Sequence, residues 1–406
     1  MFRGFLHKQR TPEYRMSNAI PMDLSLDLKN FVTPRIFIAA TRQNDGKTTT
    51  SLGLFAALQS RFGNIGYIKP VGQRFVEIDG MKIDEDSVLV NRTYKVRSPL
   101  RAMSPIAVEP NFTRRYLETG NLPDLQKQVQ NAFDEASWEK NFIIIEGTGH
   151  AGVGSVFDLS NAAVAKMLHS KVIIVSSGGI GKPIDEIALN MALFEKFGVE
   201  VIGAILNKVL PEKMDLVREY GARGLKRLGL PLLGVMPYNT ELRKPTLNQV
   251  REEIKGEFMA GADFKRRRVA RVQIGAMSAR NVENYFEPGT LIITGGDRDE
   301  LILTVLKHGE SGAAPISGVV LTGGMLPPDS TVDLIRKSNI PFMRTACDVY
   351  SVATSINRMT VKTEIGDKDK ITMIENLISR NVDVDQIVAK ASNDEVNGRQ
   401  MSLKLR

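Results

Sequence analysis

A glycine, a lysine and a threonine that follow a short apolar run are the residues best suited to do chemistry. The apolar run is Arg35–Ala40, and the loop after it reads TRQNDGKTT over residues 41–49, before a helical stretch. Gly46 has no Cβ, so the backbone can approach a ligand closely, and N–H groups at a helix N-terminus attract phosphate. Lys47 supplies a charge for the β- and γ-phosphates, and the Thr48 hydroxyl suits Mg2+. The pattern predicts a loop that binds ATP together with Mg2+.

One position of this phosphate loop (residues 41–49) departs from the usual pattern. Thr41 stands where the first glycine is normally found. The apolar run before the loop and the helical stretch after it still favour a phosphate loop over a chance Gly-Lys-Thr at a helix start. The candidate nucleotide-binding residues here are Thr41, Asn44, Asp45, Gly46, Lys47, Thr48 and Thr49.

Four charged residues further along the chain extend this hypothesis. Lys69 ends the apolar run 66–70, and the carboxyl end of a strand faces the crevice where open α/β sheets bind ligands. Glu146 ends the run FIIIE, where an unpaired buried carboxylate would be costly, so Mg2+ is its expected partner. Asp84 and Asp86 form an acidic pair that can hold Mg2+ or its waters. The alternatives are a surface lysine, loop charges and a carboxylate that caps a glycine turn. The candidate catalytic residues are Lys47 and Lys69, and the candidate metal ligands are Thr48, Asp84, Asp86 and Glu146.

The elements that must position these residues alternate between strands and helices. Continuous apolar strands separated by helices predict an α/β fold with a doubly wound, mostly parallel sheet that is buried on both faces. The expected strands are residues 35–40, 66–70, 142–146, 171–176 and 201–207, with helices such as 46–62 and 184–197, and the unit ends near residues 232–237.

A second, smaller α/β pattern follows a domain junction. Residues 246–261 are charged and are predicted to be helical, and they lead into a basic run at 265–271. Asp297 is placed to cap the helix that follows it. The last forty residues predict one helical stretch and a polar tail. The expected strands are 269–274, 289–294, 318–321 and 342–344, and the expected helices are 278–286, 298–307 and 330–338.

Composition limits the class of protein. A chain of 406 residues is too long for one ordinary core, so two domains are expected. We expect no membrane partner, because no apolar run approaches the ~20 residues that a span needs. The polar leader has no secretory pattern and Cys347 is the single cysteine, so we expect a cytoplasmic protein. The net charge is +8, but the basic run lacks interleaved aromatic residues, so we expect no nucleic-acid partner.

The motifs of the first half, taken together, resemble the dethiobiotin synthetase-like branch of phosphate-loop proteins. That branch has a threonine before Gly-Lys-Thr, a Lys-Pro-Val strand end, an aspartate shortly after it, and a Glu-Gly-x-Gly turn. The resemblance spans about residues 35–250, and it implies that Asn207, in GAILNK, contacts adenine. The matching positions are Thr41, Lys47, Thr48, Lys69, Asp86 and Glu146.

The residues after Lys69 and the motifs of the second half indicate which members of that branch this sequence resembles most. Lys69-Pro70-Val71 is followed by Gly-Gln-Arg rather than by a serine-containing substrate loop. This form looks more like the ATPase-like N-terminal region of long bacterial phosphate acetyltransferases. Residues 262–370, with QIGAMS, TGGDRD and LTGG, look like the DRTGG domain found in the same proteins, and the catalytic acetyltransferase domain is expected to be absent. A cobyrinic acid a,c-diamide synthase-like protein is an alternative, although Cys347 is in no glycine-rich elbow.

These resemblances imply a domain plan and a function. The expected parts are a polar leader (1–32), an ATP-binding domain (33–250), a DRTGG-like domain (262–370) and a helical and polar tail (371–406). The first hypothesis is a Mg-ATP-binding protein that hydrolyses ATP or transfers its phosphoryl group, with a regulatory second domain that senses an effector. The alternatives are a synthetase that activates a carboxylate or carbamate acceptor, and a nucleotide-switched module without turnover. A homodimer is expected from the resemblance.

Overall fold

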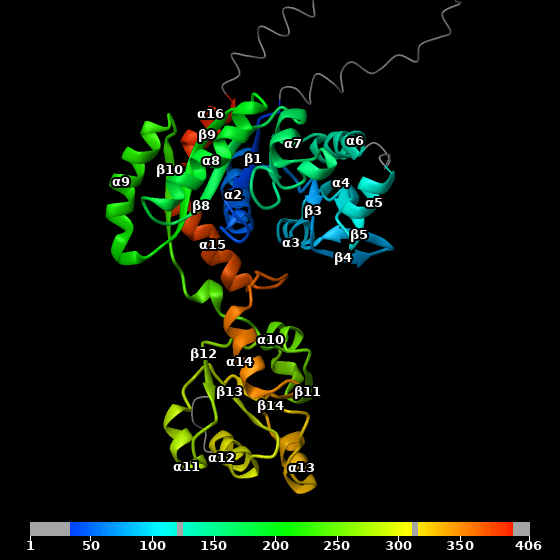
Figure 1. The fold of residues 1–406 in the computed structure, drawn as a ribbon, viewed down its shortest axis with the longest axis vertical. Helices are drawn as coiled ribbons and strands as arrows, with labels where there is room; N and C mark the ends of the chain where they lie inside the picture. Colours follow the sequence, from blue (N-terminus) through cyan, green and yellow to red (C-terminus); the bar gives the residue numbers. More distant parts are fainter. Residues whose placement is uncertain (1–32, 120–124, 311–315, 393–406) are drawn as a thin grey trace, which may run out of the picture.

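The protein folds into two lobes joined by a narrow waist (Figure 1). The computed structural model describes residues 33–119, 125–310 and 316–392. The expected polar leader and the part of the expected tail after residue 392 lie outside the described residues. Within the described ranges, no helix is both long enough and apolar enough to cross a membrane.

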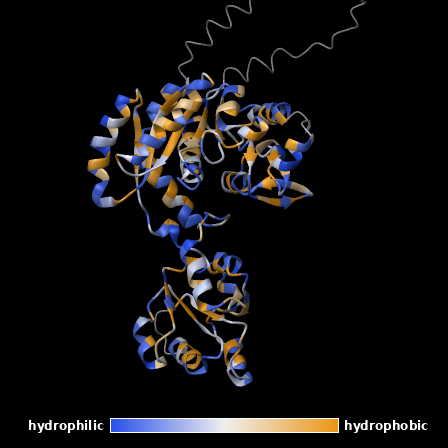
Figure 2. Cartoon of the chain, in the orientation of Figure 1, coloured by the Kyte–Doolittle hydropathy of each residue, from blue (hydrophilic) through white to orange (hydrophobic). Residues whose placement is uncertain are grey.

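The larger lobe is built on a six-stranded sheet in the order β10-β9-β8-β1-β7-β2. All its pairings are parallel, as the continuous apolar runs predicted. The strands are hydrophobic along most of their length (Figure 2). Because the chain proceeds to opposite sides of β1, the carboxyl end of β1 is the point at which such sheets bind ligands. The strands are β1 (Arg35–Ala40), β2 (Ile65–Ile68), β7 (Phe142–Glu146), β8 (Lys171–Ser177), β9 (Val201–Val209) and β10 (Leu232–Pro237).

Helices cover both faces of this sheet, so each face has its own apolar core. The helices of one face are α2 (Lys47–Phe62), α3 (Glu85–Tyr94), α15 (Lys368–Asn381) and α16 (Val384–Ser392). The helices of the other face are α6 (Leu125–Ser137), α7 (Asn161–Met167), α8 (Lys182–Lys196) and α9 (Met214–Arg227).

Small elements that the sequence had not indicated follow Lys69. A parallel pair joins β3 (Val71–Gly72) to β6 (Ile106–Ala107), and an antiparallel hairpin joins β4 (Phe75–Ile78) to β5 (Met81–Asp84). The short helices α4 (Leu100–Met103) and α5 (Phe112–Thr119) complete this corner. The hairpin returns the chain to the sheet, so Asp84 and Asp86 lie beside Lys69.

The smaller lobe is a second α/β layer structure, with strand order β11-β15-β14-β13-β12. Its strands are β11 (Glu257–Ala260), β12 (Arg271–Ile274), β13 (Thr290–Gly295), β14 (Gly318–Thr322) and β15 (Phe342–Arg344). Helices α10 (Leu247–Glu253) and α14 (Val349–Arg358) cover one face. The opposite face is covered by α11 (Ala279–Val282), α12 (Asp299–Glu310) and α13 (Asp329–Lys337). Single 3-10 turns lie at Ser155–Phe157, Pro211–Lys213, Glu241–Arg243, Ala262–Phe264 and Glu283–Tyr285.

Three predictions of local structure were wrong. The helix expected over 246–261 ends at Glu253, and β11 follows, because this segment pairs antiparallel with β15 at the sheet edge. Helix α12 begins at Asp299, so Arg298 and not Asp297 precedes its first residue, and the Arg298 guanidinium donates to the Met277 carbonyl at 3.0 Å. The single helical stretch expected after about residue 367 is two helices, α15 and α16.

The chain returns to the larger lobe after it has completed the smaller one (Figure 1). Helix α15 packs along α2, where Ile374 and Ile378 enter the core, and α16 adds Ile387 to the same core. A Cβ at Gly53 of α2 would lie 2.2 Å from Ile378 Cγ1, so the close approach of these helices depends on that glycine. The smaller lobe is therefore inserted between β10 and the last two helices of the larger lobe.

Candidate active site

The phosphate loop runs from the end of β1 to the first turn of α2. Gly46 precedes α2 with φ +107°, and a Cβ there would lie 2.0 Å from Asn207 Nδ2. Asn44 also has a positive φ of 67°. Only glycine combines that conformation with so little space, so Gly46 lets the loop close on the N-terminus of α2.

Three of the predicted residues brace the loop from behind and do not line the cavity. The Thr41 hydroxyl donates to Asp45 Oδ2 at 2.7 Å and lies 2.9 Å from the Ser176 hydroxyl. The Asn207 side-chain amide donates to the Asp45 carbonyl at 2.9 Å. Thr41 thus replaces the usual first glycine with a side chain that is itself part of the loop's hydrogen-bond network. The contact of Asn207 with adenine stays a prediction.

Lys47 is held at the centre of the loop. Its ammonium donates to the Gly149 carbonyl at 3.1 Å, so the glycine turn after β7 positions it. Burial lowers the pKa of Lys47, and the nearby Glu146 opposes this effect. A buried ammonium that is bound to carbonyls and faces a cavity suits an anionic ligand.

Lys69 lies against the three predicted acidic residues. Its ammonium contacts Asp84 Oδ1 at 3.0 Å, Glu146 Oε1 at 3.8 Å and Asp86 Oδ2. All four side chains are buried. Burial opposes protonation of Lys69, but the three carboxylates outweigh it and raise its pKa above the ordinary value. Asp84 also accepts from the Asp86 backbone N–H at 2.9 Å, so it caps α3 and fixes Asp86.

Glu146 joins the phosphate loop to this acidic cluster (Asp84, Asp86 and Glu146). The Thr48 hydroxyl donates to Glu146 Oε1 at 2.9 Å, and the buried Tyr67 hydroxyl donates to Oε2 at 3.0 Å. Burial raises the pKa of Glu146, and Lys69 opposes that shift. Burial also raises the pKa of Asp84, whereas Lys69 overcomes burial at Asp86 and lowers its pKa.

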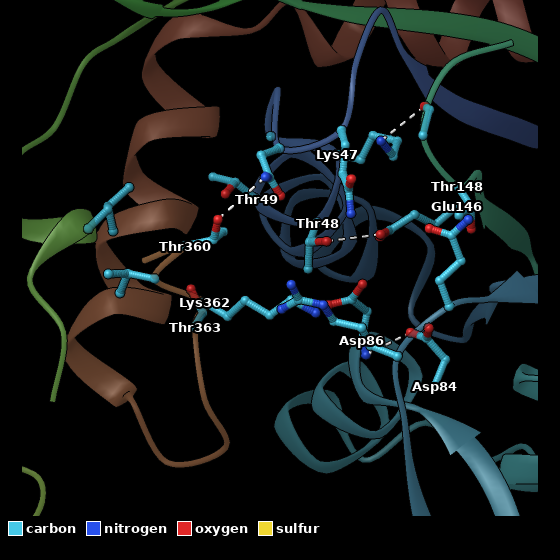
Figure 3. A pocket seen from close by; sticks show the side chains of 18 of the residues that line it. Lys47, Thr48, Thr49, Asp84, Asp86, Glu146, Thr148, Thr360, Lys362 and Thr363 are labelled. Carbon is cyan, nitrogen blue, oxygen red and sulfur yellow. Dashed lines mark hydrogen bonds between the residues drawn. The ribbon is translucent and has the colours of Figure 1, made fainter. Parts of the chain in front are cut away.

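These groups line one cavity of about 470 Å³ (Figure 3). Of the predicted residues, the cavity brings together Asn44, Gly46, Lys47, Thr48, Thr49, Lys69, Asp84, Asp86 and Glu146. Sequence reasoning missed several other lining residues, among them Lys208, Tyr238, Arg243 and the segment 358–363. Lys208 directly follows Asn207, so the motif that contains it was the available signal. Nothing near the phosphate loop in sequence points to residues 358–363.

The oxygen atoms around Thr48 fit a magnesium ion that arrives with a nucleotide. Three carboxylates contact the Lys69 ammonium, and carboxylate oxygens are the ligands that Mg2+ prefers. In the described part of the chain, no group of three or more His, Cys, Asp and Glu side chains is arranged to hold a metal alone. Mg2+ commonly takes one or two protein carboxylates and completes its shell with waters and substrate phosphates. Thr48, Asp86 and Glu146 are the residues suited to it.

Sequence families match both lobes. The family described as AAA domain matches residues 34–246, which is more than half of the chain. The chain belongs to this family. The DRTGG domain matches residues 249–359 of the same AAA-domain protein. The resemblance inferred from the phosphate loop and from the glycine motifs of the second half is therefore confirmed.

Several curated relatives of this AAA-domain protein are phosphate acetyltransferases. The enzyme of Pseudomonas aeruginosa is 27% identical over 364 residues, which cover 86% of this chain and 50% of the enzyme. The enzyme of Pseudomonas putida is 27% identical over 363 residues, with the same coverage. The chain thus spans about half the length of the curated relatives that it matches.

One solved structure with a similar arrangement contains a DRTGG domain. It is the regulatory region of a Clostridium perfringens pyrophosphatase, with CBS and DRTGG domains, complexed with its activator diadenosine tetraphosphate. It is 17% identical and covers 43% of this chain and 86% of its own, with a TM-score of 0.26.

Proposed function

We propose that this protein is a cytoplasmic Mg-ATP-binding ATPase whose smaller lobe regulates it. The cavity carries the proposal, because it gathers the phosphate-loop lysine, a second lysine and an acidic cluster beside the Thr48 hydroxyl. Lysines and backbone N–H groups bind phosphates, and the oxygen ligands would hold Mg2+. The remaining cations of the cavity wall suit a polyphosphate.

The proposed chemistry is phosphoryl transfer to water or to an acceptor. Lys47 and Lys69 both line the cavity and would stabilise the charge that develops on the transferred phosphoryl group. Mg2+, when bound, would neutralise charge on the phosphate oxygens. Thr48, Asp86 and Glu146 are the residues that would hold the Mg2+, and the two carboxylates are also contacts of Lys69.

Binding of ATP with and without Mg2+ tests the proposal by calorimetry. Lys47→Ala removes a buried ammonium at the loop, so we expect it to weaken ATP binding at least about tenfold and to abolish phosphate release. Lys226→Ala is the matched control, because Lys226 is exposed on α9 and does not line the cavity. Equal ATP affinity in wild type and Lys47→Ala would refute the proposal.

A synthetase is a second candidate, supported by Gln73 and Arg74 in the same cavity wall. Both are exposed side chains that follow Lys69, at the place where an acidic acceptor would approach the γ-phosphate. ADP release that depends on an added carboxylic acid would support the synthetase. ADP release that does not depend on the acid would leave the ATPase as the remaining candidate of the two. We also propose a homodimer, from the resemblance to dethiobiotin synthetase-like domains, and light scattering of the purified chain tests it.

A further inference from the structure

One wall of the cavity comes from outside the phosphate-loop lobe. Residues 358–363, the connecting segment, begin at the last residue of α14 in the smaller lobe and end before α15, and all six line the cavity. Figure 3 shows Thr360, Lys362 and Thr363 on the opposite side of the pocket from Glu146 and Thr148. A ligand that fills the cavity therefore meets both the phosphate loop and the connecting segment.

The connecting segment contacts each of the parts that would surround a triphosphate. Asn44 Nδ2 of the phosphate loop lies 3.5 Å from Thr360 Oγ1. The Lys362 ammonium donates to Glu85 Oε2 at 2.9 Å, and Glu85 is the residue between Asp84 and Asp86. On the side of the smaller lobe, Gln249 Nε2 donates to the Lys362 carbonyl at 2.9 Å. Gln249 belongs to the capping box that starts α10, so the segment is tied to the smaller lobe as well.

The ion pair of Lys362 is a weak one. The side chains of Lys362 and Glu85 are 31% and 40% exposed, so water screens their attraction. Lys362 lines the same cavity as Asp86 of the acidic cluster. It also shares this cavity with Thr48 and Lys69, which are the residues expected to bind the terminal phosphates.

We propose that Lys362 is a phosphate-sensing residue that exchanges Glu85 for the terminal phosphate of a bound nucleoside triphosphate, and that this exchange couples the cavity to the smaller lobe. The inference rests on the proposed nucleotide function and adds a regulatory residue to it. A phosphate carries more charge than one carboxylate and offers several acceptor oxygens, so it competes successfully for a screened lysine. The Lys362 carbonyl accepts a hydrogen bond from Gln249, so a movement of the Lys362 side chain is transmitted to α10.

The test compares ATP and ADP affinities of wild type, Lys362→Gln and Glu85→Gln by calorimetry. We expect Lys362→Gln to weaken ATP binding about tenfold and ADP binding much less, because only ATP carries the terminal phosphate. Glu85→Gln removes the competing carboxylate, so we expect ATP to bind about threefold more tightly. Lys368→Gln is the matched control, since Lys368 is an exposed lysine that does not line the cavity.

Hydrogen exchange supplies a readout that a merely structural lysine would not move. ATP is expected to slow amide exchange in the connecting segment and in α10 of the wild type, and not in Lys362→Gln. Lys362→Arg keeps the charge and is expected to restore both the ATP preference and the protection. Equal losses for ATP and ADP, or protection by ATP that survives in Lys362→Gln, overturn the inference.

The outcomes separate this inference from the function on which it rests. If wild type binds ATP and Lys47→Ala does not, while Lys362→Gln binds both nucleotides normally, only the sensing role fails. If wild type binds no ATP, the proposed function fails as well. Thermal unfolding without nucleotide identifies a misfolded variant, and in that case Lys362→Arg and Glu85→Gln decide the question.

Discussion

At the scale of single residues, the candidate site depends on small groups as much as on charged ones. The loop is closed by contacts of Thr41, Asp45 and Asn207 that need no ligand. This arrangement is preorganised for an anion, because the side chains that shape the backbone are already paired.

Gly46→Ala is expected to abolish nucleotide binding. The new Cβ would meet Asn207 Nδ2 at 2.0 Å, and the residue has φ +107°. Gly63→Ala, at the other end of α2, is the control: it also has a positive φ, but no atom lies within 4 Å of its Cβ position. We expect Gly63→Ala to lose about 1 kcal/mol of unfolding free energy from backbone strain, and Gly46→Ala to lose more because its methyl group also meets Asn207. Calorimetry should show that only Gly46→Ala loses the ligand.

Thr41→Val is expected to lower the unfolding free energy by about 1–3 kcal/mol, because it leaves Asp45 Oδ2 and the Ser176 hydroxyl without their buried partner. Thr41→Ser keeps the hydroxyl and should remain near wild type in chemical denaturation. A Thr41→Val variant as stable as wild type would show that the hydroxyl network does not hold the loop.

The charged residues of the site were predictable, and their partners were not. Lys47, Lys69 and Glu146 lie at the ends of strands or helices. The hydrophobic pattern of these elements, and the cost of burying a charge there, were enough to indicate a ligand. The contact of Lys69 with three carboxylates depends on the hairpin β4–β5. Its strands are short and only partly buried, so they give no clear apolar pattern in the sequence.

At the scale of elements, the long apolar strands were predicted well and the edges were not. Strands β1 and β7 have the expected bounds because they are buried on both faces. Strand β11 was missed because it is short, half exposed and paired on one side only. Helix α15 was placed in a tail, although its apolar residues belong to the core of the larger lobe.

Gly53→Ala is expected to destabilise the protein by about 1–3 kcal/mol, although alanine is the better helix former. The added methyl group would lie 2.2 Å from Ile378 Cγ1 and would push α15 away from α2. Ile378→Ala in the same chain removes that Cγ1 and leaves the Cβ, which is 2.7 Å from the position of the added methyl group. Denaturation of the two single variants and the double variant should therefore give a combined loss smaller than the sum. An additive result would mean that the helices do not touch here.

At the scale of the whole molecule, a buried lysine lies where the two lobes meet. The Lys370 ammonium of α15 donates to the Lys244 carbonyl at 3.0 Å, next to the pair that Arg268 forms with Asp367. Burial, and after it the charge of Arg268, lowers the pKa of Lys370 from 10.5 to about 8, against the opposing effects of Asp367 and Glu364.

This lowered pKa predicts a rise of stability with pH. Between pH 8 and 10.5 the unfolded chain binds more protons at Lys370 than the folded chain, so the unfolding free energy increases across this window. Below pH 8 Lys370 is protonated in both the folded and the unfolded chain, so the folded protein bears the full free-energy cost of the buried charge. Lys370→Met removes this contribution, so the stability of wild type relative to the variant should rise from pH 8 to 10.5 in denaturation titrations. A difference that does not change with pH would contradict the prediction.

The insertion of the smaller lobe sets the order in which the protein is made. Translation proceeds from the N-terminal to the C-terminal side, so the ribosome completes β11 to α14 before it releases α15 and α16. Until then the nascent larger lobe exposes part of the apolar face that Ile374, Ile378 and Ile387 later cover. The smaller lobe has its own two cores, so it can fold before α15 and α16 leave the ribosome. The cavity, one wall of which is the connecting segment, is thus completed only after the smaller lobe has been synthesised.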